Sequence, residues 1–144
     1  MADLLRSESR LVRLKALYMV GTLNMSSLAQ NVCETLLHDA CPVVRHEAAY
    51  QLGVLKPAGA LSALCQALVE DPEELVRHEA AEALGELGDR DAFPWLERAC
   101  RDTSESVRAT AAIAREEIEV IAAARDAIGF AADREYEGSV VQAA

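Results

Sequence analysis

Apolar residues along this chain recur mainly at the three- and four-residue spacing of amphipathic helices. In one segment Val44, Ala48, Leu52 and Leu55 fall on a single side of a helical wheel. Residues 76–87 repeat the same stripe. No segment shows the alternation of apolar and polar residues that indicates a strand. The pattern predicts an all-α protein.

A Val-Arg pair marks the same point of four successive copies. The pairs begin at Val12, Val44, Val76 and Val107, so the spacings are 32, 32 and 31 residues. The copies read VRLKALYMVGTL, VRHEAAYQLGVL, VRHEAAEALGEL and VRATAAIAREEI. Further apolar segments, such as the one that ends at Asp71, lie between these helices. Two helices per period of about 32 residues are typical of an α-solenoid, in which each hairpin buries its apolar face against its neighbours.

The ends of the chain depart from the repeat. The helix of the fourth copy is predicted to end at Gly129. We therefore expect a repeat domain over 1–130 and a C-terminal tail over 131–144, because the last segment has weak periodicity and several charges. The arginine of each Val-Arg pair is present in all four copies, so we interpret it as an inter-repeat ion-pair or carbonyl contact that belongs to the fold.

Length and charge narrow the class of protein. A chain of 144 residues is one domain in size. Its net charge of −10 disfavours nucleic acid and anionic lipid as partners and favours basic or neutral ones. The sequence contains no stretch long and apolar enough to span a membrane, and charged residues interrupt the first ten positions. On these grounds we expect a cytoplasmic protein. The four cysteines form no CxxC pair, and in a well-packed chain of this kind we expect them to be reduced thiols.

The middle two copies carry a His-Glu pair directly after Val-Arg. On the helical wheel His46 lies about 165° from the centre of the apolar stripe and Glu47 about 95° from it. His78 and Glu79 repeat this geometry, so both pairs are predicted to face outward, side by side on neighbouring helices. Small residues share the histidine face and are expected to leave space around the imidazoles; they are Ala49, Gly53, Ala81 and Gly85.

Two imidazoles and one carboxylate form the ligand set that non-haem iron, manganese or zinc accepts, and for iron this set leaves positions open for dioxygen. Neighbouring helices lie close enough for two such side chains to reach one ion. The alternative is that His-Glu is a solvated surface motif that was duplicated with the repeat.

The HEAAYQLG run from His46 and the HEAAEALGELGD run from His78, set in two-helix units, resemble deoxyhypusine hydroxylase. That family has HEAT-like repeats and a di-iron centre between two homologous halves, and it hydroxylates a modified lysine of a translation factor. The resemblance covers one half of such an enzyme. It implies that His46, His78 and Glu79 are iron ligands and that Glu47 is an adjacent carboxylate, a further candidate ligand that orients substrate or water.

A half-enzyme has half of the family's ligands, so the resemblance implies a homodimer that holds two irons, uses dioxygen as co-substrate and acts on a basic protein or amine. The same repeats also resemble phycobilin lyases and related HEAT-like adaptors, so a metal-free protein-binding scaffold is the alternative. A HEAT-like DNA glycosylase is disfavoured, because the acidic chain offers no track for phosphates.

Overall fold

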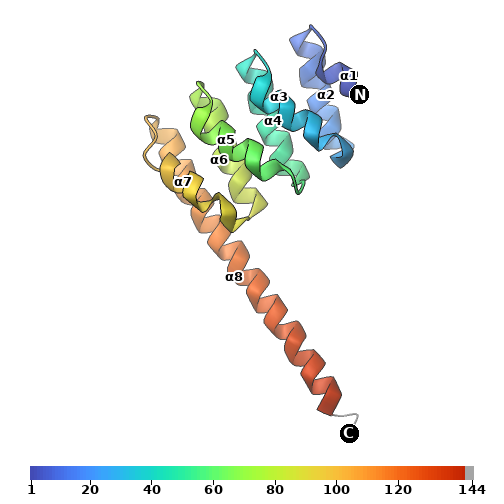
Figure 1. Cartoon of the computed structure of the whole chain (residues 1–144), viewed down its shortest axis with the longest axis vertical. Coiled ribbons are helices and arrows are strands. Elements are labelled where there is room, and N and C mark those ends of the chain that lie inside the picture. The colour runs from blue at the N-terminus through green and yellow to red at the C-terminus, as the bar shows by residue number, and fades with distance from the viewer. Residues whose placement is uncertain (142–144) are drawn as a thin grey trace.

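In the computed structural model the chain is a stack of helical hairpins, as the repeat predicts. The structure describes the backbone of residues 1–141 and the side chains up to Ile128. Helices α2, α4, α6 and α8 pack side by side in one layer, and α3, α5 and α7 form the other (Figure 1). The helices are α1 (Ala2–Leu5), α2 (Arg10–Thr22), α3 (Ala29–His38), α4 (Pro42–Leu55), α5 (Ala60–Glu70), α6 (Glu74–Leu87), α7 (Phe93–Ala99) and α8 (Glu105–Val141), with 3-10 turns at Ser26–Leu28 and Arg90–Ala92. The described residues contain no strand, which confirms the all-α solenoid.

The helix ends follow from local sequence. Pro42 occupies the first turn of α4, where its missing N–H removes no helical hydrogen bond. Gly88 closes α6 with φ of 68°, a left-handed conformation that a residue with a side chain adopts at a higher energy. These signals set where each hairpin turns.

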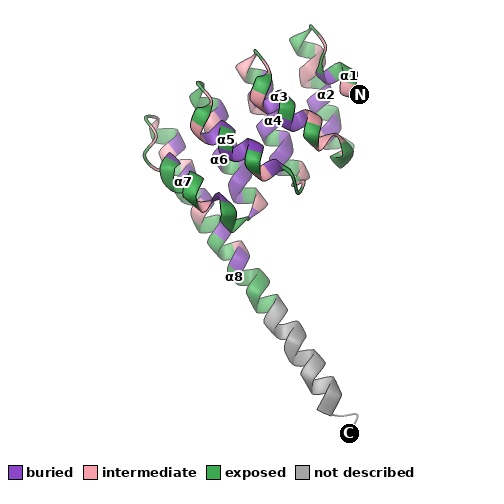
Figure 2. Cartoon of the chain, viewed as in Figure 1, coloured by how far each residue is buried: buried purple, intermediate pink, exposed green. Residues whose placement is uncertain are grey.

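The core lies between the two layers (Figure 2). The stripe that the sequence predicts on α4 faces this core: Val44, Ala48 and Leu52 are fully inaccessible to solvent, and Leu55 at the end of the helix is partly buried. Leu64 and Leu68 of α5 are equally buried and belong to the same apolar cluster. Each helix of the stack therefore buries its apolar side against neighbours, as a solenoid requires.

A repeated arginine–aspartate clamp ties each hairpin to the next. Arg45 on α4 binds Asp71 through two hydrogen bonds, of 2.7 Å from Nε and 2.9 Å from Nη2. Its Nη1 donates to the carbonyl of Asp39, at 2.8 Å. The carboxylate of Asp71 also accepts the backbone N–H of Glu73 and so shapes the turn before α6. These contacts confirm the interpretation of the repeated arginine as part of the fold.

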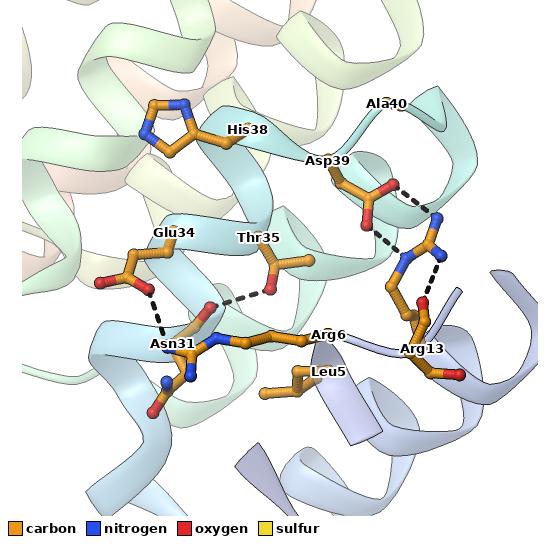
Figure 3. A pocket seen from close by; sticks show the side chains of 10 residues that line it. Leu5, Arg6, Arg13, Asn31, Glu34, Thr35, His38, Asp39 and Ala40 are labelled. Carbon is orange, nitrogen blue, oxygen red and sulfur yellow. Dashed lines mark hydrogen bonds and ion pairs between the residues drawn. The ribbon is translucent and has the colours of Figure 1, made fainter. Parts of the chain in front are cut away.

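The same clamp recurs along the stack. Arg13 pairs with Asp39, and Arg77 pairs with Asp102. Figure 3 shows the first of these pairs at the wall of a cavity of about 370 Å³ between the first hairpin and α3. The guanidinium of Arg77 lowers the pKa of Asp102 below its ordinary value. In the last copy Arg108 donates only to the carbonyls of Asp102 and Thr103 among the bonds of the described residues.

The fourth copy differs from the sequence prediction at its end. Helix α8 does not end at Gly129 but continues to Val141, away from the stack (Figure 1). A glycine inside a helix raises the free energy by only about 1 kcal/mol relative to alanine, which is too little to end a helix of this length. Residues 142–144 of the predicted tail lie outside the described residues.

The described part of the chain contains no helix that combines the length and the apolar character needed to cross a membrane. The four cysteines are free, as expected, and burial raises the pKa of the Cys65 thiol to about 11. A thiol with this pKa stays protonated at neutral pH and does not act as a nucleophile.

Replacing Arg45 with Met should lower the free energy of unfolding by about 3 kcal/mol, because the substitution leaves the carboxylate of Asp71 buried without its partner. The side chains of Arg45 and Asp71 are only 10% and 6% exposed. Urea unfolding followed by circular dichroism measures the change. Arg101→Met, at an exposed position between α7 and α8, is the matched control. Equal stabilities of the two variants would contradict a structural role for the clamp.

Candidate metal-binding site

The two His-Glu pairs lie at equivalent positions of the neighbouring helices α4 and α6. The histidine of the first pair contacts the glutamate of the second. His46 Nε2 on α4 is 3.1 Å from Glu79 Oε2 on α6. The imidazole of His46 is 39% exposed, so the pair is open to solvent on one side. The structure thus brings together two of the residues predicted from the sequence, across the boundary between two repeats.

Glu79 is more buried than the sequence predicted. The helical wheel placed it on the outward flank of α6, yet its side chain is only 10% exposed. The wheel describes a single helix, whereas in the stack α4 and α8 both pack against α6 and cover its flanks. Burial is the main cause that raises the pKa of Glu79, to about 7; the charges of Glu82, Glu86 and Glu47 contribute to this rise, and His78 opposes it.

Glu47 lies beside this pair and makes a different contact. Its Oε1 accepts a hydrogen bond of 2.6 Å from Nε2 of Gln51, one turn further along α4. It is near enough to Glu79 for its charge to affect the pKa of that carboxyl group. The structure therefore places Glu47 next to the site and bonded within its own helix.

His78 faces the fourth repeat. Its Nδ1 is 3.0 Å from the hydroxyl of Ser106 and 2.9 Å from the hydroxyl of Thr110, both on α8. Its Nε2 is 3.7 Å from Oε2 of Glu82. Neither hydroxyl residue was predicted as part of the site, because the fourth copy has no His-Glu pair. The repeat alignment contained a signal, since Thr110 stands three residues after Val107 just as Glu79 stands three residues after Val76.

The small residues near the histidines serve the contacts between helices, a role that the sequence did not predict. Ala49, Gly53, Ala81 and Gly85 are all buried. A Cβ added to Gly53 would lie 3.2 Å from the Cα of Ala83 on α6, a distance shorter than ordinary van der Waals contact. Small side chains at these positions therefore let consecutive helices of this layer approach closely.

Large apolar side chains are exposed on the helices that carry the site and on their neighbours α2 and α8. They lie on the face of α2, α4, α6 and α8 that the other layer does not cover; they are Leu11, Tyr18, Val43, Tyr50, Val54, Leu75 and Ile113, each between 47% and 67% exposed. Beyond them a groove of about 430 Å³ runs between α6 and α8. Ile113, Val120 and Ile121 contribute its apolar side chains, and Glu86, Glu116 and Glu117 contribute carboxylates.

Imidazole and carboxylate are suitable metal ligands, and the structure brings two of them, His46 and Glu79, close together. Within the part of the chain that the structure describes, no group of three or more His, Cys, Asp or Glu side chains is placed to hold a metal ion. The converging donors are an imidazole nitrogen and a buried carboxylate surrounded by three further glutamates. A cation would relieve the repulsion among these carboxylates.

Glu79→Gln should stabilise the metal-free protein above neutral pH. The folded state raises the pKa of Glu79 from 4.5 to about 7, so the favourable contribution of the protonated form is complete below 4.5 and is lost as the pH rises through 7. The amide avoids this loss, and its advantage should approach about 3 kcal/mol in alkaline solution.

Unfolding free energies of both proteins between pH 5 and 8.5 measure this advantage. Glu97→Gln, at an exposed position on α7, is the control. If Glu79→Gln were less stable than the parent protein at the alkaline end, the hydrogen bond between His46 and Glu79 would outweigh the effect of burial.

Comparison with known proteins supports the architecture. The chain is similar to human deoxyhypusine hydroxylase, with 30% identity and a TM-score of 0.73 over 82% of this chain. It spans 42% of the length of that enzyme. It is also similar in fold to phycocyanin lyase, the complex of CpcE and CpcF from Nostoc, with 19% identity and a TM-score of 0.59. That match covers 81% of this chain and 63% of the lyase chain.

No curated protein matches the chain by sequence. The HEAT repeats family matches residues 1–83, 29–116 and 61–143, which together span nearly the entire chain. The period of 32 residues, the paired helices and these matches agree, and the chain belongs to the family of HEAT-repeat proteins.

Proposed function

We propose that this protein is an iron-binding, dioxygen-reactive HEAT-repeat protein of the deoxyhypusine hydroxylase type. The observation that carries the proposal is the contact of 3.1 Å between His46 and Glu79, which joins the His-Glu motifs of two repeats. The likeness to the human hydroxylase over 82% of this chain supports it. His46, His78 and Glu79 are the proposed iron ligands, and Glu47 is the adjacent carboxylate that orients substrate or water.

The electrostatics of the site favour a cation. Glu79 is buried, and three further carboxylates raise its pKa. Iron held by two imidazoles and one carboxylate supplies oxidation chemistry with dioxygen, of which hydroxylation is the proposed outcome. The residues of this chain would bind the ion, orient the substrate through Glu47 and exclude water through the apolar side chains around the site.

A homodimer would complete the centre. The chain spans 42% of the hydroxylase, so two copies supply a comparable number of repeats. Val43, Tyr50 and Leu75 are 59%, 49% and 65% exposed, and each lies about one helical turn from a histidine of the site, so they would supply apolar surface to a face-to-face contact. A two-fold arrangement would bring together His46, Glu47, His78 and Glu79 of both subunits, with two irons per dimer.

The proposed substrate is a basic protein or an amine. The groove between α6 and α8 has apolar side chains beside Glu86, Glu116 and Glu117, with Lys56 as the cation among its lining residues. Such a groove suits an alkyl chain that carries a positive charge. The net charge of −10 would also speed the encounter with a basic partner.

A metal-free scaffold is the second candidate. It is favoured by the contacts that both histidines make without a metal, with Glu79 for His46 and with Ser106 and Thr110 for His78. The fold that this chain shares with phycocyanin lyase is compatible with such a role. The two candidates differ in whether purified protein holds iron.

Native mass spectrometry and elemental analysis of protein loaded with ferrous iron should find two chains and two irons. His78→Ala should lose the iron while the helical circular dichroism remains, because His78 lies outside the apolar core. His38→Ala, at the end of α3, is the matched control and should keep the metal. A monomer that binds no ferrous iron would exclude the proposed function and favour the scaffold.

A further inference from the structure

The fourth repeat lacks His-Glu, yet two of its side chains reach the histidine of the third repeat. The hydroxyls of Ser106 and Thr110 lie one turn apart on α8, at 3.0 Å and 2.9 Å from the same nitrogen, Nδ1 of His78. Both distances are those of hydrogen bonds. The arrangement raises the question of which atom carries the proton.

A proton on Nδ1 accounts for both contacts. If Nδ1 were unprotonated, its single lone pair would be directed at one donor, and the second hydroxyl would have no such bond to make there. A protonated Nδ1 can share its N–H between two acceptor oxygens. The other nitrogen fits this assignment, because Nε2 is 3.7 Å from Oε2 of Glu82, which is longer than a hydrogen bond.

Comparison of the repeats shows that the contact of His78 with α8 corresponds to the contact of His46 with α6, with different partner groups. Thr110 is the counterpart of Glu79, so His78 meets Thr110 where His46 meets Glu79. The nitrogen differs, however, because His46 uses Nε2 and His78 uses Nδ1. The fourth repeat therefore replaces a carboxylate with neutral hydroxyls and engages the opposite side of the imidazole ring.

We propose that Ser106 and Thr110 are positioning residues that hold His78 in the Nδ1–H tautomer and keep the lone pair of Nε2 available to a metal ion. A histidine ligand commonly has its second nitrogen fixed by such a bond, which sets both the tautomer and the ring orientation. The metal part of this inference rests on the proposed iron site. The proton assignment does not, because the contacts exist without a metal.

Nitrogen-15 NMR of the full-length, metal-free protein tests the proton assignment. Spectra near pH 8.5, about two units above the ordinary histidine pKa, report the neutral tautomer of each ring. His78 should show the Nδ1–H form in the parent protein. Ser106→Ala combined with Thr110→Val should shift it toward the Nε2–H form that free histidine favours. An Nε2–H form in the parent protein would overturn the proposal.

Iron titration of the same proteins tests the positioning role. The double variant should bind ferrous iron about 10- to 100-fold more weakly, the usual effect of removing the partner of a histidine ligand. Restoring one hydroxyl, in Ser106→Ala with Thr110→Ser, should recover both the tautomer and most of the affinity. Thr22→Val removes an exposed hydroxyl that bonds within α2 and is the control for threonine replacement.

The two readouts separate this proposal from the proposed function. Unchanged iron affinity in the double variant would overturn the positioning role and leave the iron site standing. A parent protein that binds no iron would overturn the proposed function, and the metal role of Ser106 and Thr110 with it. In that case the NMR spectrum of the metal-free protein would still decide whether Nδ1 of His78 carries the proton.

Discussion

The arginine–aspartate clamp is the interaction on which the rest of the structure depends. Each turn is held twice: the carboxylate of Asp39 binds Arg13 of one hairpin, and its carbonyl accepts a hydrogen bond from Arg45 of the next. The clamp therefore fixes the spacing and the rotation of successive hairpins. Since a HEAT-repeat stack has few contacts between distant parts of the chain, this local geometry sets the position of every helix that carries a site residue.

The candidate site is a consequence of that stacking and of small residues between the helices. Glycine at position 53 lets α4 approach α6, and this approach brings His46 to Glu79. The same approach removes Glu79 from water and raises its pKa. Thus the packing that stabilises the solenoid also creates a carboxylate that is unfavourable when charged, a combination that is common at functional sites.

The sequence predicted the architecture well because the repeat is a property of the chain itself. The period, the buried stripe from Val44 and the role of the arginines could all be predicted from the order of residues along the chain. The environment of Glu79 and the contacts of His78 could not, because they depend on which flank of each helix the next repeat covers. The end predicted at Gly129 failed for a simpler reason, which is that one glycine outside the packed stack is too weak a signal to end a long helix.

The fourth repeat carries Glu116 at the position that glycine occupies in the other three, at residues 21, 53 and 85. In the interior of the stack this position lies against the next helix, where a Cβ on Gly85 would be only 3.0 Å from the Cα of Ala114. Glu116 has a long charged side chain where the interior repeats need glycine for close approach of the next helix. The outer side of the fourth repeat therefore lacks the small residue that lets the other repeats stack, a difference expected at the end of a solenoid, where a polar outer face replaces the packing surface.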